Sequence, residues 1–215
     1  MEQDMLTTPE ALAGLPAEAS HYIGSVAGGA CGFNTYRVPA GIYGAALSSA
    51  NWYDAGNCGA CLEVTGPRGN KIMAMVVDKC PGCAPNFLNI MEGGYNTLLT
   101  GQSFRDRINV EWHIVSCRIA QPLAVQNAAG ASPHWFSLQI QNSNYPVSHI
   151  EVSNDNGKTW ESTVSRDYNY FEGARMGGFE TDTVDLKISC FNGRMVYMKN
   201  VPVEKDKKVW ATSNC

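Results

Sequence analysis

The sequence lacks the features by which membrane-spanning and nucleic-acid-binding proteins are most easily recognised. No apolar stretch approaches the roughly 20 residues needed to span a bilayer. Charged residues make up only 17% of the chain and the formal net charge is −4. There is no long run of positive charge, and so no electrostatic footprint for nucleic acid. Neither a membrane nor a nucleic acid is therefore expected as a partner.

The start of the chain also lacks the segments of a signal peptide. Met1–Ser20 holds no positively charged segment followed by an apolar one. The protein is therefore either cytosolic or a processed chain. Residues 1–19 are mostly Ala, Pro, Glu and Thr, and we expect them to form a flexible leader.

Helix signals are few as well. The 21 glycines and the recurring Asn-Gly and Arg-Gly turns separate short apolar segments, which is typical of β-structure. Residues 93–101 place Tyr95, Leu98 and Leu99 at helical spacing, which predicts one short helix. Residues 107–117 alternate between apolar and polar, as a half-buried strand does. The sequence thus predicts an all-β protein.

The chain of 215 residues has room for two small domains, each with its own core. Residues 119–124 contain a proline and are typical of a short linker. Beyond them come several short alternating segments separated by turns, which predict a β-sandwich of roughly a hundred residues. We therefore assign residues 20–118 to a first domain and residues 125–215 to a β-sandwich.

The chain contains eight cysteines, an even number. In a loop-rich chain this favours a disulfide framework and an oxidising compartment. Cys190 and Cys215 are the only pair available beyond the linker, and we expect them to form a disulfide. The six cysteines before the linker allow about fifteen pairings, which the sequence alone does not resolve.

Two spacings offer other interpretations of the cysteines. Cys58-x-x-Cys61 and Cys80-x-x-Cys83 match the bare pattern of a four-cysteine zinc ribbon. The second of them is also compatible with a thioredoxin-like redox pair. Zinc would leave the other cysteines unexplained, and a redox pair should lead directly into a helix, which Ala84-Pro85 prevents. Structural disulfides are therefore favoured, and neither a metal nor a cofactor is expected.

The segment from Asp78 to Met91 carries the strongest signal of a site. It follows an apolar run, Ile72–Val77, that predicts a buried strand, and it places a carboxylate where that strand ends. A Cys-Pro-Gly-Cys turn then leads back into apolar sequence at Phe87. Functional side chains are often placed in such a connection between rigid elements.

Several motifs, taken together and in this order, resemble those of expansins, in particular the two-domain microbial expansin-like proteins. The motifs are Gly28-Gly29-Ala30-Cys31-Gly32-Phe33, Cys58-Gly59-Ala60-Cys61, Val77-Asp78-Lys79-Cys80-Pro81, His134-Trp135-Phe136, Asn142–Val147 and Asp167-Tyr168-Asn169. The resemblance extends from residue 20 to about residue 212.

This resemblance implies a six-stranded double-psi β-barrel followed by an immunoglobulin-like carbohydrate-binding module of family 63. It implies secretion, cellulose and other plant cell wall polysaccharides as the partner, and loosening of polysaccharide contacts without hydrolysis as the activity. We also expect a monomer. For the first domain it implies three disulfides, which are Cys31–Cys58, Cys61–Cys117 and Cys80–Cys83.

Three positions correspond to polar residues of the expansin groove. Ser20 stands where the family usually has a threonine, and Asp78 matches a family aspartate. Asn89 falls where the family usually has the aspartate that corresponds to the general acid of related family 45 glycoside hydrolases. Cleavage of a glycosidic bond normally requires two carboxyl groups, and an amide does not titrate near working pH. The protein is therefore not expected to be a hydrolase.

Some of these groove residues also have a structural interpretation. Asp78 is well placed to cap the backbone of the Cys-Pro-Gly-Cys turn. Tyr22, Trp52 and Tyr53 are candidates to line the groove, and each is equally compatible with a place in the core.

A second candidate site lies at the start of the β-sandwich. Phe136 is in phase with apolar residues and should face the core. Trp135 should face water, because it is in phase with three polar residues, Ser137, Gln139 and Gln141. An exposed tryptophan on a sheet is suited to stacking on a sugar. By resemblance, Tyr168 is a second aromatic residue of this platform, and His134 takes the place of a third.

Two other functions remain open at this point. The protein could be a weak endoglucanase or a peptidoglycan-cleaving relative on the same barrel, or a glycan-binding module without loosening activity. Release of reducing sugar distinguishes the first of these, and extension of wall strips under load distinguishes the second.

Overall fold

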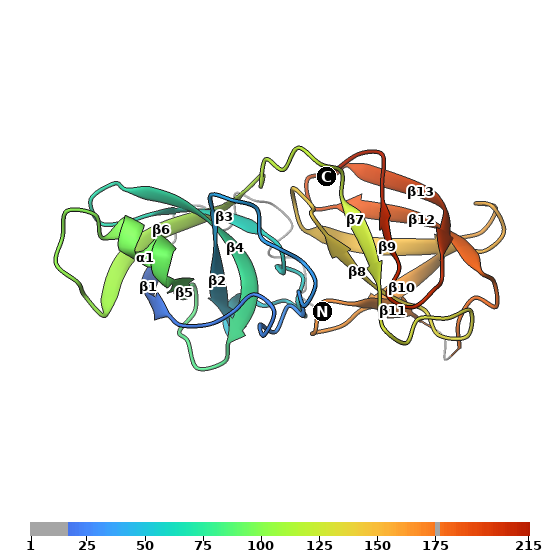
Figure 1. The fold of residues 1–215 in the computed structure, drawn as a ribbon, viewed down its shortest axis with the longest axis horizontal. Coiled ribbons are helices and arrows are strands. Elements are labelled where there is room, and N and C mark those ends of the chain that lie inside the picture. The colour runs from blue at the N-terminus through green and yellow to red at the C-terminus, as the bar shows by residue number, and fades with distance from the viewer. Residues whose placement is uncertain (1–16, 175–176) are drawn as a thin grey trace, which may run out of the picture. The chain divides into compact units, whose positions relative to one another are not determined.

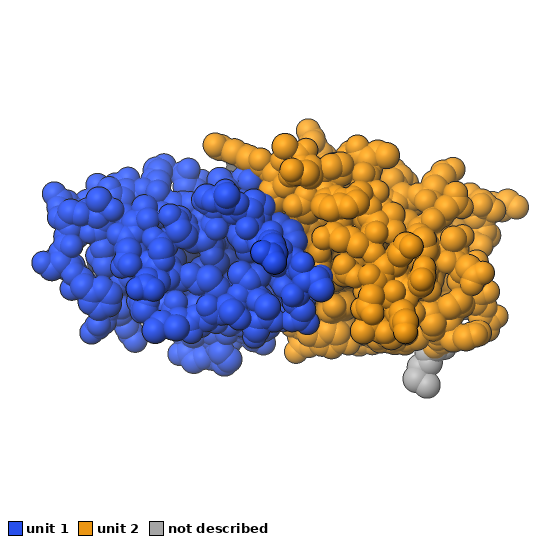
Figure 2. All heavy atoms as spheres, viewed as in Figure 1, with its two compact units in different colours: residues 1–53, 57–117 blue, residues 54–56, 118–215 orange. Residues whose placement is uncertain are grey.

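The computed structural model describes residues 17–174 and 177–215. The chain divides into two compact units (Figure 2), one made of residues 1–53 and 57–117 and the other of residues 54–56 and 118–215. No helix within the described ranges is long and apolar enough to cross a bilayer.

The structure corrects the expected ends of two segments. Most of the expected leader, residues 1–16, lies outside the described residues. Ala17–Ala19 do not belong to a leader, because they form the first half of strand β1 (Ala17–Tyr22) and pair with β6. Ala124, expected in the linker, is the first residue of strand β7 (Ala124–Asn127).

The first unit is a closed barrel of six strands in the order β1-β5-β2-β4-β3-β6 (Figure 1), which confirms the expected six-stranded barrel. The pairs β1–β5 and β2–β4 are parallel. The other strands are β2 (Ile42–Ser48), β3 (Cys61–Thr65), β4 (Lys71–Cys80), β5 (Leu88–Met91) and β6 (Arg107–Val115), accompanied by the helix α1 (Glu92–Leu98) and a 3-10 helix, Ser49–Asn51.

The apolar patterns of the sequence explain the barrel core. In β6 the apolar residues of the alternating segment, among them Val110 and Trp112, are buried. In β4 the continuous run Ala74–Val77 is buried on both faces, as in a strand covered on both sides. The helix α1 buries Tyr95 and Leu98. Burying one such large side chain contributes about 1.5–3 kcal/mol.

The second unit has eight strands in the order β13-β12-β9-β10-β11-β8-β7-β14. One apolar core contains residues from β7 and β8, such as Leu138, and from β9, β12 and β13, such as Ile150, Leu186 and Val196. The predicted β-sandwich is thereby confirmed. The strands after β7 are β8 (Ser137–Gln141), β9 (Val147–Ser153), β10 (Glu161–Ser165), β11 (Phe171–Gly173), β12 (Thr183–Cys190), β13 (Met195–Pro202) and β14 (Lys208–Trp210).

All eight cysteines are paired in the structure. The disulfides are Cys31–Cys58, Cys61–Cys117, Cys80–Cys83 and Cys190–Cys215, the same pairs that were expected. A four-cysteine zinc ribbon is not formed, because each of its cysteines is bonded to another sulfur.

Candidate functional site

Four residues form a straight row across adjacent strands of the barrel. Ser20 in β1 pairs with Asn89 in β5, Asn89 pairs with Ala46 in β2, and Ala46 pairs with Asp78 in β4. Residues that are paired directly across strands point to the same face of a sheet. Ser20, Asn89 and Asp78 are partly exposed, whereas Ala46 is buried. We call these four residues the polar row, and it brings the three predicted groove residues together.

A bulge in β4 places Asp78 in this row. The pairing of β2 with β4 shifts between Ala45 and Ala46, so that Val77 has no partner in β2. Without this extra residue Ala46 would pair with Val77, and the side chain of Asp78 would point to the opposite face. The carbonyl oxygen of Val77 instead accepts a hydrogen bond from the backbone N–H of Cys31 at 3.3 Å.

The carboxylate of Asp78 is held by three donors. Tyr22 donates from its hydroxyl group to Oδ2. The backbone N–H groups of Ala30 and Lys79 donate to Oδ1 at 2.7 and 2.8 Å. Burial raises the pKa of Tyr22 to about 12, and the hydrogen bond to Asp78 acts in the same direction. Asp78 therefore fastens the glycine-rich loop, residues 24–32, to the end of β4. Of its two expected roles, a groove residue and a cap of the Cys-Pro-Gly-Cys turn, these hydrogen bonds do not support the cap.

Gly29 allows the glycine-rich loop to approach β4 this closely. A Cβ atom at this position would lie 2.2 Å from the carbonyl oxygen of Val77 and 3.1 Å from the Cβ of Asp78. The first contact is with backbone, which has no alternative rotamer to adopt. Only glycine therefore fits beside Val77, and the N–H of the next residue, Ala30, is thereby brought to Asp78.

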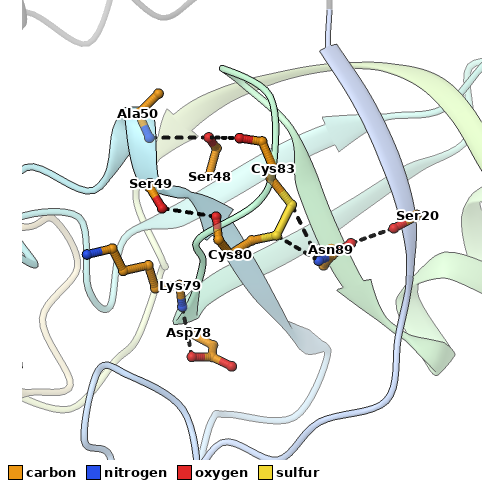
Figure 3. Close-up of a disulfide and its surroundings, with 9 residues drawn as sticks. All are labelled: Ser20, Ser48, Ser49, Ala50, Asp78, Lys79, Cys80, Cys83 and Asn89. Atoms are coloured by element: carbon orange, nitrogen blue, oxygen red, sulfur yellow. Dashed lines mark hydrogen bonds between the residues drawn. A yellow bond between two sulfur atoms is a disulfide. The ribbon is translucent and has the colours of Figure 1, made fainter.

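The Asn89 amide links Ser20 to a disulfide (Figure 3). Its Oδ1 accepts a hydrogen bond from the Ser20 hydroxyl at 2.5 Å, and its Nδ2 donates to Cys80 Sγ at 3.3 Å and to Cys83 Sγ at 3.6 Å. Both ends of the amide are thus engaged, and neither supplies a transferable proton near neutral pH. The polar row therefore contains one carboxylate and an amide where two carboxyl groups would be required for ordinary glycoside hydrolysis.

The aromatic groove candidates lie in different environments. Tyr22 is partly exposed and contacts the polar row through Asp78. Tyr53 is 47% exposed. Trp52 is only 2% exposed and packs in the core, with the ammonium group of Lys79 5.5 Å from its ring centroid. The assignment of Trp52 to the groove lining is therefore corrected, because its ring is not available to stack on a sugar.

In the second unit, Trp135 is exposed at a turn that precedes β8. Its backbone exchanges two hydrogen bonds with Ser132, each 3.0 Å long, and its side chain is 42% exposed. Gly130 lies against the indole, since a Cβ atom there would be 2.8 Å from the ring. His134, one residue before Trp135, is exposed.

Tyr168 is held in place by a hydrogen bond to Glu172, which also forms an ion pair with Arg166. Its side chain is 47% exposed, and its hydroxyl group donates to Glu172 Oε1 at 2.7 Å. The other oxygen of Glu172 accepts from Arg166 Nε at 2.8 Å. The hydrogen bond to Glu172 is the main cause that raises the pKa of Tyr168. Glu172 pairs with Ser137 in β8, so the residue that fixes Tyr168 points to the same face as the polar residues of β8.

Trp135 is exposed, as predicted, but not for the predicted reason. Ser137, Gln139 and Gln141 were expected to face water, yet each is at most 2% exposed. They are buried because polar side chains cover one another: Gln141 Nε2 donates to Gln139 Oε1 at 2.8 Å, and Lys208 Nζ donates to Gln141 Oε1 at 2.9 Å. Trp135 is exposed because it lies in the turn.

Trp210 is an exposed aromatic residue that the sequence analysis missed. It is 52% exposed and pairs with Ala124, which pairs in turn with Gln141. It therefore points to the same face of the sheet as Gln141. The ammonium group of Lys208 lies 5.0 Å from its ring centroid, and burial lowers the pKa of Lys208. The alternation of Lys208, Val209 and Trp210 was the available signal.

Comparison with known proteins gives a consistent set of relatives. No protein-family model matches the chain. It is 29% identical over 138 residues to expansin-YoaJ of Bacillus subtilis, an alignment that covers 64% of this chain and 56% of that protein. It is 24% identical over 208 residues to expansin-like protein 1 of Dictyostelium discoideum, covering 92% of this chain and 70% of that protein. The chain thus matches little more than half of the length of the Bacillus protein.

Solved structures agree with these relatives. The fold superposes on the apo crystal structure of the Clavibacter michiganensis expansin with a TM-score of 0.79, 25% identity and coverage of 93% of this chain and 96% of that one. A mutant of that expansin in complex with cellohexaose has the same fold, with a TM-score of 0.78, 24% identity and the same coverage.

A closed six-stranded barrel and a β-sandwich in one chain, with a polar row on the former and exposed aromatic residues on the latter, define an expansin-type architecture. Together with the relatives in Bacillus and Dictyostelium, this architecture shows that the chain is similar to expansins and expansin-like proteins.

Proposed function

We propose that this protein is secreted, binds cellulose and related plant cell wall polysaccharides, and loosens contacts between polysaccharide chains without cleaving them. The observation that carries this proposal is the composition of the polar row. It offers hydroxyl, amide and carboxylate groups for hydrogen bonds to a glycan, and it contains a single carboxylate.

The groups in the row support the proposed absence of hydrolysis. A hydrolase needs one acid to protonate the leaving oxygen and a second carboxylate to act as base or nucleophile. Asp78 is engaged by Tyr22 and two backbone N–H groups. Asn89 carries no acidic proton, and its amide is fixed between Ser20 and the disulfide. The row is therefore suited to competing for the hydrogen bonds of a glycan.

The exposed aromatic residues of the second unit are suited to binding the polysaccharide. Flat sugar rings pack their C–H edges against aromatic faces. Trp135, Tyr168 and Trp210 are all more than two-fifths exposed. Trp135 directly precedes β8, Tyr168 is held by Glu172 of β11, and Trp210 lies in β14. These strands belong to the half of the sandwich formed by β7, β8, β11 and β14. His134 offers a smaller ring beside Trp135. We define the aromatic platform as Trp135, Tyr168, His134 and Trp210.

Two further observations support the setting of this function. Four disulfides suit an oxidising, extracellular compartment. The related Clavibacter expansin was crystallised, in a mutant form, in complex with cellohexaose, a soluble fragment of the same kind of polymer. We infer a monomer that acts on the wall directly.

The test combines binding, mechanics and chemistry on the same preparation. Binding isotherms on crystalline cellulose should give saturable binding, wall strips under load should extend on addition of the protein, and soluble glucan should release no reducing sugar. Binding without extension would instead favour a glycan-binding module without loosening activity. Reducing sugar released in proportion to protein would favour a weak endoglucanase.

A further inference from the structure

The disulfide between Cys80 and Cys83 is more accessible than the other three. Both half-cystines are partly exposed, and Pro81 and Gly82 between them are exposed. Each of the other disulfides contains at least one half-cystine that is no more than 4% exposed. The Cys-Pro-Gly-Cys turn therefore lies at the surface, where a reductant in solution can approach it.

This disulfide also contributes least to holding the fold together. Its half-cystines are 3 positions apart, whereas the other pairs are separated by 27, 56 and 25 positions. A cross-link that closes a short loop removes little entropy from the unfolded chain. The barrel therefore does not depend on this bond in the way that it depends on Cys61–Cys117.

The backbone of the turn is fixed by groups other than the two sulfur atoms (Figure 3). Ser49 Oγ donates to the carbonyl oxygen of Cys80, and Ser48 Oγ donates to the carbonyl oxygen of Cys83, each at 3.1 Å. The N–H of Cys83 donates to the carbonyl oxygen of Cys80 at 3.4 Å. These bonds do not involve the sulfur atoms, so they can hold the two thiols side by side when the disulfide opens and allow the bond to form again.

Asn89 donates hydrogen bonds to the two sulfur atoms and thereby favours thiol–disulfide exchange. Its Nδ2 group donates to both, and Cys80 Sγ is the nearer at 3.3 Å against 3.6 Å for Cys83 Sγ. A hydrogen bond to the charged form of a group favours that form, and the thiolate is the better leaving group in thiol–disulfide exchange. Cys80 is therefore the sulfur that leaves, and Cys83 is the sulfur that is attacked.

We propose that Cys80 and Cys83 form a reversible thiol–disulfide exchange site whose co-reactant is a dithiol. One thiolate of the dithiol attacks Cys83 Sγ, the Cys80–Cys83 bond breaks, and its electron pair remains on Cys80 Sγ. The second thiolate of the dithiol then displaces Cys83 Sγ and closes the disulfide of the co-reactant. Two electrons and two protons pass to the protein, and a small disulfide reverses the reaction.

This proposal revises one step of the sequence analysis and does not depend on the glycan function. A redox pair was set aside because no helix follows the Cys-Pro-Gly-Cys turn. In the structure, Ser48 and Ser49 fix the turn and Asn89 supplies the donor to sulfur. These side chains thus provide what the start of a helix provides in thioredoxin-like pairs.

The test is a graded reduction of the folded, full-length chain with dithiothreitol, followed by alkylation with iodoacetamide and peptide mass mapping. We expect Cys80 and Cys83 to be alkylated at dithiothreitol concentrations about tenfold or more below those that expose any other cysteine. The near-ultraviolet circular dichroism should be retained at that stage, and oxidised glutathione should restore the disulfide. Reduction of all four disulfides together, or loss of the folded signal with the first two thiols, would overturn the proposal.

Four variants sharpen this test. Cys80→Ser/Cys83→Ser should release no thiol in the low range of dithiothreitol while keeping its folded signal. Asn89→Asp replaces the N–H donor by a carboxylate and so raises the pKa of the leaving thiol. The rate at which dithiothreitol reduces the disulfide should therefore fall about fivefold. Iodoacetamide should react at lower pH with Cys80 in Cys83→Ser than with Cys83 in Cys80→Ser. Equal pH profiles for the two single variants would contradict the assignment of Cys80 as the leaving sulfur.

Discussion

The hydroxyl group of Tyr22 donates a hydrogen bond to the carboxylate of Asp78, which lies 56 positions further along the chain. The strands that carry these residues, β1 and β4, are not neighbours, because β5 and β2 lie between them in the barrel. The bond therefore spans the polar row, and it orders the end of β4 together with the N–H groups of Ala30 and Lys79.

Tyr22 should make the protein less stable as the pH rises from about 10 to about 12. The pKa of this tyrosine is about 12 in the folded protein, against 10.0 for an unperturbed tyrosine. The folded state retains a proton that the unfolded chain has already lost, so the contribution is fully present below pH 10 and is lost as the pH approaches 12. Urea unfolding across this range should give a shallower pH dependence for Tyr22→Phe than for the natural chain.

Tyr36 supplies a comparison for this experiment. Burial alone raises its pKa to about 12, and it has no carboxylate partner among the contacts described. Tyr36→Phe should also flatten the pH profile, whereas only Tyr22→Phe should release the loop held by Asp78 and increase proteolysis in residues 24–32. Equal proteolysis of the two variants would contradict the role given to the Tyr22–Asp78 bond.

Replacement of Gly29 by alanine should destabilise the first unit. The added Cβ would lie 2.2 Å from the carbonyl oxygen of Val77, and overpacking of this kind costs about 1–3 kcal/mol. Gly82→Ala is the matched control, because nothing lies within 4 Å of a Cβ at that position and the expected change is within about 0.5 kcal/mol. Chemical denaturation of the two variants measures the difference, and equal stabilities would show that the loop does not need its close contact with β4.

Removal of aromatic rings from the platform should weaken binding to cellulose. Trp135→Ala, Tyr168→Ala and Trp210→Ala should each lower the affinity for crystalline cellulose by about tenfold, equivalent to about 1.4 kcal/mol. Tyr197→Ala is the control, because Tyr197 is 57% exposed on β13, in the other half of the sandwich. Binding isotherms measure the effect. A loss for Tyr197→Ala as large as for the three others would refute a localised platform.

Loss of the disulfide between Cys190 and Cys215 should destabilise the second unit. The half-cystines are 25 positions apart, and a loop of this size corresponds to about 3 kcal/mol in the chain-entropy model. Cys190→Ser/Cys215→Ser should therefore unfold at a lower urea concentration than the natural chain. The Cys80→Ser/Cys83→Ser variant should lose less stability, and the reverse order would contradict the account of the four disulfides.

Much of this architecture could be predicted from the sequence because it depends on local patterns. The alternation in residues 107–117 and the apolar run before Asp78 identified β6 and β4 directly. The bulge at Val77 could not be read in the same way, because it is defined by pairing with β2, some thirty positions earlier. Unless the bulge at Val77 is known, the alignment of Asp78 with Asn89 in one row cannot be predicted.

The site residues were harder to predict than the strands, since burial depends on tertiary partners. Trp52 has polar neighbours in the sequence, yet its ring is enclosed in the core. Gln139 and Gln141 are polar and were expected to be exposed, yet they bury each other through a side-chain hydrogen bond. Lys208, 67 positions further along the chain, donates a second hydrogen bond to Gln141. The pairing of β14 with β7, and of β7 with β8, likewise places Trp210 on the same face of the sheet as Gln141.

The central claim is that the polar row loosens contacts between polysaccharide chains without cleaving them. One paired measurement tests this claim most directly. The natural chain and Asp78→Asn are each applied to wall strips under constant load, and the bathing solution is assayed for reducing sugar. Our account predicts extension with the natural chain, reduced extension with Asp78→Asn, and no reducing sugar above background from either. Reducing sugar released by the natural chain and abolished by Asp78→Asn would contradict it.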